Sequence, residues 1–205
     1  MLKVGVVNSG VCNLFSLENL LSYLDVTFIS SSDPNQLIDC SHLILPGVGT
    51  FDSGMLNLKK SGLDIFLKTQ VGKEIPLLGI CLGMQLLFSD SEEGNEKGLG
   101  IVPGKIKRFP KEIKKVPHIG WNEVNYGHSQ VDMFEGIENK TCFYFIHSYY
   151  ADLLGNEINH YQTSHENFSF TSVIQCERIF ATQFHPEKSQ GAGLSLMKNF
   201  LKVKS

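Results

Sequence analysis

The chain has 205 residues, of which 42% are hydrophobic and 19% charged, and its formal net charge is −3 at pH 7. These values are typical of a globular protein that buries a full core, and we assign residues 1–205 to one domain. The acidic balance argues against a general binder of nucleic acid or of anionic membranes, which would need a basic surface. Because the sequence shows no apolar run of the roughly 20 residues that span a membrane and no secretory signal, we expect a cytoplasmic protein.

In the first half of the chain, short apolar runs alternate with helical patterns. Helices are predicted at 14–24, with Asn13 as a candidate cap, at 51–70 as one or two helices, and at 82–88. The strands predicted between them are 2–7, 26–29, 42–45 and 77–80. Continuous apolar strands between helices indicate a parallel sheet that is covered by helices on both faces.

The second half of the chain is dominated by strand patterns. Strands are predicted at 101–108, 121–125, 143–149, 170–177 and 179–183, followed by a closing helix at 191–203. These elements predict an α/β fold with an antiparallel or mixed extension. The basic stretch 105–115 could contact an anion or a partner, but with a negative net charge we favour a solvated strand and loop.

The five cysteines are scattered and include no Cys-x-x-Cys pair. Their odd number and wide spacing argue against a disulfide framework and a structural zinc site, and we expect neither a metal nor a cofactor. By default each cysteine is a small buried hydrophobe. Cys81 requires a different explanation.

Cys81 stands in the pattern Gly79-x-Cys81-x-Gly83, between a predicted strand and a predicted helix. This is the cysteine form of a nucleophile elbow, in which flanking glycines let the backbone turn sharply and expose the nucleophile. The helix N-terminus favours the thiolate, which is the form that attacks a carbonyl carbon. The alternative is a structural cysteine in a glycine-rich turn, which two such closely spaced glycines make less favourable.

A cysteine nucleophile needs a base and a group that orients the base. The segment His185-Pro186-Glu187 supplies both, since residues i and i+2 of an extended backbone point the same way and Pro186 stiffens the pair. Taken alone, this segment would more simply be a surface histidine near a surface glutamate. With an elbow cysteine elsewhere in the chain, we favour a Cys81–His185–Glu187 triad.

The segment Pro46-Gly47-Val48-Gly49 follows an apolar strand. Its glycines permit conformations that turn N–H groups toward a ligand, and the Leu82 N–H just after the nucleophile is the other natural oxyanion donor. Alternatively, the segment is a plain turn between a strand and a helix.

Together these motifs resemble the class I (triad-type) glutamine amidotransferases, and within that family the glutaminase subunits of imidazole glycerol phosphate synthase. Pro117-His118-x-Gly120-Trp121-Asn122 and Lys188-Ser189-Gln190 are particularly characteristic of those subunits. The further stretches that carry the resemblance are 45–49, 79–88, 91–94, 98–104, 145–150 and 181–190. They span nearly the whole chain.

The resemblance implies a flavodoxin-like three-layer fold and no cofactor. Cys81 is then the nucleophile, His185 the general base and later the acid, and Glu187 the group that orients it. The matching oxyanion positions are Val48 and Leu82. The positions that hold the glutamine substrate are Gly49, Gln85, Glu93, His147, Ser148 and Tyr149. The positions that face the partner are Asn13, Trp121, Tyr144 and Lys188.

The implied reaction is hydrolysis of L-glutamine to glutamate and ammonia through a cysteine thioester. Ammonia passes directly into a cyclase subunit, a (β/α)8 barrel that forms a heterodimer with the glutaminase and makes imidazole glycerol phosphate and AICAR in histidine biosynthesis. The glutaminase is then largely idle alone and awaits an allosteric signal from the partner's ligand.

Three other functions would also account for parts of the sequence: a glutaminase that feeds a different synthase, such as a sugar-amidating enzyme of surface glycan assembly; a silent regulatory module; and an unrelated cysteine hydrolase. The intact triad argues against the second, and the segments 117–122 and 188–190 argue against the third. The chain has Asn8-Ser9 where the family commonly has Asp-Tyr, and Cys12 where it commonly has glycine. These departures lie near the expected partner surface and bear on the partner's identity.

Several of the matched residues also have simpler explanations. Gln85 could face solvent, and Glu93 lies in an acidic loop that is usually just solvated. Trp121 and Tyr144 could be ordinary core or sheet aromatics. His118 and His147 are expected to be structural or to contact the ligand, because no cluster has the spacing of a zinc site. These alternatives make specific predictions about burial.

Overall fold

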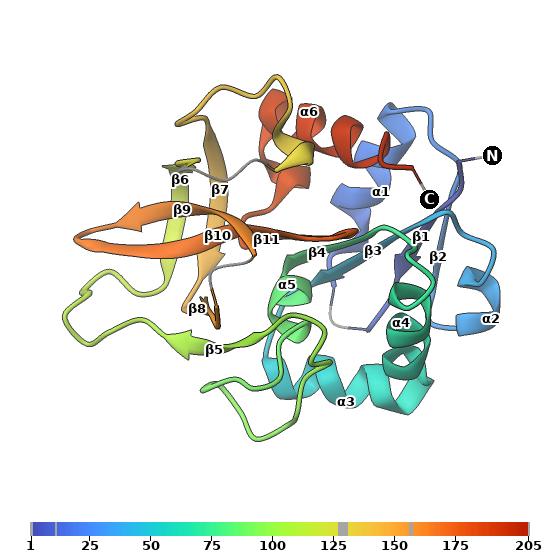
Figure 1. The fold of residues 1–205 in the computed structure, drawn as a ribbon, viewed down its shortest axis with the longest axis horizontal. Helices are drawn as coiled ribbons and strands as arrows, with labels where there is room; N and C mark the ends of the chain where they lie inside the picture. The colour runs from blue at the N-terminus through green and yellow to red at the C-terminus, as the bar shows by residue number, and fades with distance from the viewer. Residues whose placement is uncertain (1, 11, 127–130, 156–157, 205) are drawn as a thin grey trace.

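The computed structural model describes residues 2–10, 12–126, 131–155 and 158–204 (Figure 1). Within these residues a nine-stranded sheet has the order β2-β1-β3-β4-β11-β10-β8-β5, with β9 paired to β10, and β6 and β7 form a separate pair. The order β2-β1-β3-β4-β11 is that of a flavodoxin-like sheet. The short apolar strands in the first half of the sequence predicted a parallel sheet, and the parallel pairing of β2, β1, β3 and β4 confirms this prediction.

The sheet is parallel at one end and antiparallel at the other. The parallel strands are β1 (Val4–Val7), β2 (Phe28–Ser31), β3 (His42–Gly47), β4 (Leu77–Cys81) and β11 (Ile179–Thr182). The antiparallel strands are β5 (Gly104–Arg108), β8 (Tyr149–Leu153), β9 (Asn159–His165) and β10 (Phe168–Cys176). The separate antiparallel pair is β6 (His118–Glu123) and β7 (Cys142–His147).

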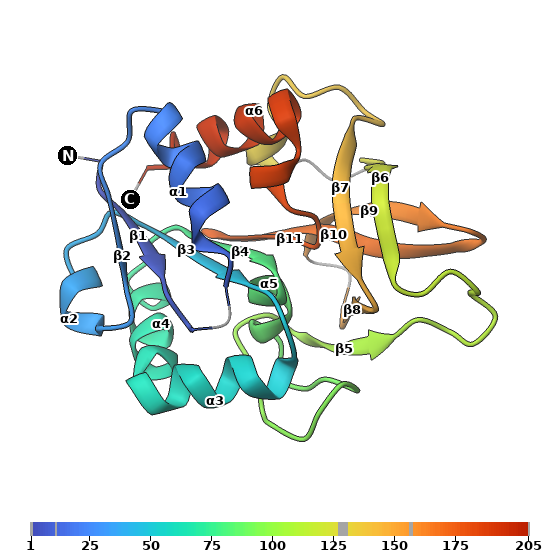
Figure 2. The ribbon, with the colours of Figure 1, turned by 180° about the vertical axis from the view of Figure 1, so that it is seen from behind.

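Helices cover both faces of the parallel part (Figure 2). One face carries α1 (Leu14–Tyr23) and α6 (Gln190–Phe200), and the other carries α3 (Phe51–Ser61), α4 (Leu63–Val71) and α5 (Leu82–Leu86). The remaining helices are α2 (Pro34–Leu37) and the 3-10 turns η1 (Asp132–Phe134) and η2 (Pro186–Lys188). No helix in the described ranges has the length and apolar character to cross a bilayer.

Two hydrophobic cores lie on opposite faces of the sheet because successive strand residues point to opposite sides. In β3, Ile44 packs with α1 and α6, whereas Leu43 and Leu45 pack with α3, α4 and α5. Strands buried on both faces read as continuous apolar runs, which is the pattern seen in the sequence. The predicted α/β fold with an antiparallel extension is confirmed.

Several element boundaries differ from the prediction. The stretch 51–70, predicted as one or two helices, is two helices, because Gly62 adopts φ +71 between them. The strand predicted at 143–149 is divided at Ser148, since β7 pairs with β6 whereas β8 pairs with β5. Strand β9 and helix α2 were not predicted. Asn13 occupies the cap position of α1, but its side chain makes no capping hydrogen bond.

Candidate active site

Cys81 ends β4 and directly precedes α5, as predicted for an elbow. The sharp turn lies at Cys81 itself, which has φ +54, a left-handed conformation that costs about 1–3 kcal/mol in a residue with a side chain. The flanking glycines serve a different purpose from the one predicted, because they allow close packing. A Cβ on Gly83 would lie 1.7 Å from the carbonyl oxygen of Leu45, and one on Gly79 would lie 2.9 Å from the backbone of Met84.

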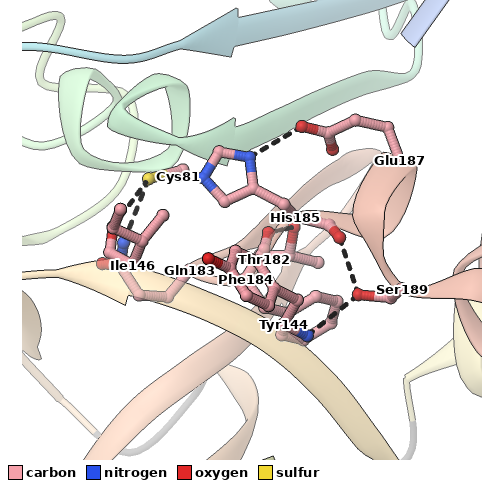
Figure 3. A network of polar contacts seen from close by, with 9 residues as sticks. All are labelled: Cys81, Tyr144, Ile146, Thr182, Gln183, Phe184, His185, Glu187 and Ser189. Carbon is pink, nitrogen blue, oxygen red and sulfur yellow. Dashed lines mark hydrogen bonds and ion pairs between the residues drawn. The ribbon is translucent and has the colours of Figure 1, made fainter. Parts of the chain in front are cut away.

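His185 and Glu187 form a buried pair beside this turn. Nδ1 of His185 lies 2.7 Å from Oε1 of Glu187, and the two side chains are only 3% and 6% exposed. The reason given for the pairing was wrong, since Glu187 does not lie in extended backbone but in the 3-10 turn η2 that begins at Pro186. Figure 3 shows the imidazole between the carboxylate and Cys81.

The imidazole of His185 has an unusual affinity for protons. Burial alone would lower the pKa of His185, but Cys81 on one side and Glu187 on the other outweigh burial and raise it to about 10. Nε2 of His185 is buried and has no hydrogen-bond partner among the described residues, and Cys81 lies beside it. A protonated His185 at this position stabilises a thiolate on Cys81.

A cavity of about 310 Å³ opens over Cys81 and His185. All the residues that the sequence predicted for the substrate or the oxyanion line it: Val48, Gly49, Leu82, Gln85, Glu93, His147, Ser148 and Tyr149. Lys188 also lines it, as do Pro117 and Ile146, which were not predicted. The structure therefore brings residues from distant parts of the chain to one cavity around the thiol.

Val48 and Leu82 are the two residues whose backbone N–H groups were predicted to bind an oxyanion. Val48 stands between Gly47, whose Cβ would be 3.0 Å from the Gly83 nitrogen, and Gly49, which has φ +98. Leu82 is the first residue of α5, so its N–H has no partner within the helix. Both residues line the cavity.

Gln85 is only 5% exposed, so the alternative that it faces solvent is wrong. Its Nε2 donates to the carbonyl of Tyr149 at 3.2 Å and to Oε1 of Gln183 at 3.0 Å. Glu93 is half-buried, and burial raises the pKa of its carboxyl although Oε2 accepts the Phe51 N–H at 2.7 Å. The acid therefore lies at the N-terminus of α3, where a negative charge is favourable.

A chain of buried hydrogen bonds supports the wall formed by His147. Nδ1 of His147 lies 2.8 Å from the Tyr149 carbonyl, so it carries the proton, and Nε2 accepts from Nδ1 of His118 at 3.0 Å. Nε2 of His118 then accepts from Nδ2 of Asn122 at 3.1 Å. Burial lowers the pKa of His118 to about 4 and that of His147 to about 3. Within the described part of the chain no cluster of His, Cys, Asp and Glu could hold a metal ion.

The outer face of the β6–β7 pair carries Ile119, Trp121, Tyr144 and Ile146, which we call the β6–β7 patch. Trp121 is 48% exposed, so it is not a core aromatic. Lys188 is exposed at the cavity, and its Nζ lies 5.9 Å from the centre of the Tyr144 ring. The structure thus brings three of the four predicted partner residues together.

The fourth predicted partner residue, Asn13, comes from outside the β6–β7 pair and η2. It is exposed at the start of α1, a helix that packs beside η2. Among the unpredicted residues, Gln183 contacts Cys81, with its Nε2 3.7 Å from the sulfur. Strand β11 ends at Thr182, so Gln183 and His185 do not share a strand face, and no local pattern in the sequence identifies Gln183.

The chain matches a family model described as glutamine amidotransferase class-I over residues 16–203. It is 43% identical over 201 residues to a Methanococcus maripaludis protein named imidazole glycerol phosphate synthase subunit HisH 2, covering 97% of this chain and 98% of the relative. A Chlorobium luteolum protein named imidazole glycerol phosphate synthase subunit HisH is 41% identical over 198 residues, covering 96% of this chain and 98% of the relative.

Solved structures share the fold at much lower sequence identity. A glutamine amidotransferase crystal structure superposes with a TM-score of 0.76 at 18% identity and covers 97% of both chains. A glutamine amidotransferase from Thermotoga maritima superposes with a TM-score of 0.69 at 17% identity and covers 98% of this chain and 99% of that chain.

Proposed function

The chain belongs to the class-I glutamine amidotransferase family, and we propose that it is the glutaminase subunit of an imidazole glycerol phosphate synthase in histidine biosynthesis. It hydrolyses L-glutamine to glutamate and ammonia. The observation that carries the proposal is the cavity in which Cys81 and His185 meet all the predicted glutamine-binding residues. Relatives align along nearly the whole chain, which supports one glutaminase domain over residues 1–205. We further propose that this domain works in the cytoplasm.

In the first half of the reaction, the thiolate of Cys81 attacks the side-chain amide carbon of glutamine. The oxygen that becomes negative accepts the N–H groups of Val48 and Leu82. His185 donates a proton to the amide nitrogen, and ammonia leaves as the carbon–nitrogen bond breaks. The product is a γ-glutamyl thioester on Cys81. Glu187 keeps Nδ1 of His185 protonated and directs Nε2 at the reacting atoms.

In the second half, His185 takes a proton from a water molecule, which attacks the thioester carbonyl. The same two N–H groups accept the second oxyanion, and its collapse releases glutamate and restores the sulfur of Cys81. Gln85, Glu93, His147, Ser148 and Tyr149 hold the substrate in the cavity throughout. Glu93 supplies the negative charge that suits the α-ammonium group of glutamine.

Ammonia must leave unprotonated, since ammonium is no nucleophile, and this requires a partner seated at the cavity. The names of the relatives describe subunits of a synthase, so the partner is its cyclase subunit. The partner is a (β/α)8 barrel that forms a heterodimer with this chain. It docks on the β6–β7 patch, on Lys188 and on Asn13, because most of these residues are exposed and two of them, Ile146 and Lys188, line the cavity.

The proposal is tested by measuring glutamate formation with and without the cyclase subunit of the same organism and that subunit's nucleotide substrate. Strong stimulation by the loaded partner is expected. If Cys81 reacts with a glutamine-analogue label but the cyclase has no effect, the glutaminase feeds another synthase, such as a sugar-amidating enzyme. If neither labelling nor turnover occurs, the chain is a silent module and the proposal fails.

A further inference from the structure

We propose that Gln183 is a further catalytic residue, whose side-chain amide donates a hydrogen bond to the thiolate of Cys81. This inference rests on the proposed function, in which the sulfur attacks an amide carbon. Gln183 is fully buried, and its Nε2 lies 3.7 Å from the sulfur, within the range of a hydrogen bond to sulfur. A buried amide at the nucleophile needs an explanation, because burying an amide is costly unless its hydrogen bonds are made.

The orientation of the Gln183 amide is fixed by its neighbour. Gln85 uses its Nε2 to donate both to the Tyr149 carbonyl and to Oε1 of Gln183. Oε1 of Gln183 is therefore the acceptor in this pair, and Nε2 must face the sulfur of Cys81. If the amide were flipped, two donors would face each other and an oxygen would face the sulfur. The group of Gln183 that faces the nucleophile is therefore an N–H donor, and the hydrogen bond from Gln85 fixes this orientation.

The hydrogen bond from Gln183 stabilises the thiolate form of Cys81 more than the thiol form. Among the described residues the sulfur has two hydrogen-bond contacts, with the Gln183 amide and with the carbonyl oxygen of Ile146 at 3.8 Å. A thiol can donate to the carbonyl, but a thiolate has no proton to donate and is repelled by the carbonyl oxygen. The amide N–H bond, in contrast, strengthens when its acceptor becomes charged. Gln183 therefore favours the reactive form, and His185 stabilises it from the other side.

Gln183 does not line the cavity, so it acts on the nucleophile without touching the substrate. A loss of its N–H should change the reactivity of the sulfur and the turnover number while leaving the KM for glutamine nearly unchanged. A residue that merely shaped the cavity would change KM instead.

The experiment measures the pH dependence of alkylation of Cys81 by iodoacetamide, followed by mass spectrometry of the Cys81 peptide. Q183M removes the N–H donor at nearly constant size. Q183E keeps the acceptor for Gln85 but places at the sulfur a carboxyl that takes up the negative charge in place of the thiol. The matched control is Q70M, because Gln70 is another buried glutamine, 3% exposed, in α4 and outside the cavity.

For Q183M we expect the midpoint of alkylation to move about one to two pH units higher, since a hydrogen bond to a charged group is worth that much. The shift should be larger for Q183E and absent for Q70M. Turnover of glutamine by the complex should fall roughly tenfold or more in both Gln183 variants, and the KM should stay nearly unchanged in Q183E, which keeps the acceptor for Gln85. Unshifted alkylation in whichever Gln183 variant folds would overturn the role.

The alkylation assay needs neither glutamine nor a partner. It therefore reports on Gln183 even if the chain proves to act on another substrate, whereas failure of the proposed function would appear as absent turnover in the wild-type complex. An unchanged midpoint together with normal wild-type turnover refutes the Gln183 role alone.

Discussion

The buried His118–His147 pair makes a quantitative prediction about pH and stability. The pKa of His118 is lowered to about 4 in the folded protein, against about 6.5 in the unfolded chain. Below pH 6.5 His118 is therefore protonated in the unfolded chain, whereas in the folded protein it stays neutral until about pH 4. Folding stability falls as the pH drops through this window, because the unfolded state binds more protons.

The substitution H118Q removes the titration but keeps the hydrogen bonds. A glutamine amide can donate to Nε2 of His147 and accept from Nδ2 of Asn122, as His118 does. When the pH falls from 7.5 to 5.0, the protonation of His118 in the unfolded chain alone should reduce the wild-type free energy of unfolding by about 2 kcal/mol. This value follows from the difference between the folded pKa of about 4 and the unfolded pKa of about 6.5. The variant should lack this loss and retain the parallel contribution of His147, whose pKa is also lowered.

The measurement is urea unfolding of the wild type and H118Q at both pH values, and the quantity compared is the difference between their pH-dependent changes. The control is H160Q, since His160 lies outside this hydrogen-bond chain and its Nδ1 lies 2.9 Å from the Ile158 carbonyl. If H118Q loses as much stability as the wild type on going to pH 5.0, His118 is not held neutral and the proposed direction of the hydrogen bonds is incorrect.

The other predictions concern the elbow and the partner surface. C81A should abolish glutamine hydrolysis but leave partner binding intact, and residual hydrolysis would exclude Cys81 as the nucleophile. G83A should lower the free energy of unfolding, measured by chemical denaturation, by about 3 kcal/mol or more, because the new Cβ would lie 1.7 Å from the Leu45 carbonyl oxygen. The matched control is G191A, since a Cβ on Gly191 would meet no described atom within 4 Å. K188A should reduce stimulation by the cyclase about tenfold with little change in the KM for glutamine, and unaltered stimulation would remove Lys188 from the interface.

The sequence predicted the parts of the site that follow from local pattern. Gly79-x-Cys81-x-Gly83 after an apolar strand indicated a nucleophile at a strand–helix turn, and the structure has that turn. The purpose of the glycines was not predictable, because Gly83 is required by its contact with Leu45, far away in the sequence. Local spacing likewise paired His185 with Glu187 but gave the wrong backbone for the pair.

Buried polar residues were the main features that the sequence did not reveal. Strand β9 was missed because one of its two inward positions is the fully buried Thr163, where an alternating pattern would have an apolar residue. Gln183 and His118 are buried because distant segments supply their hydrogen-bond partners, and no spacing rule reports such contacts. Local pattern therefore does not identify such buried polar residues in this chain, and Gln85 and His147, which also have long-range partners, were predicted only through the family resemblance.

Ile146 connects the outer surface of the protein with the nucleophile. Its side chain is 41% exposed on the β6–β7 patch, whereas its carbonyl oxygen is 3.8 Å from the sulfur of Cys81. On the inner side of the same two strands, the chain from His118 through His147 ends on the Tyr149 carbonyl, which also accepts from Gln85. A protein that binds the outer face of β6–β7 therefore contacts a residue that touches the nucleophile directly, so docking and thiol chemistry share one two-stranded element.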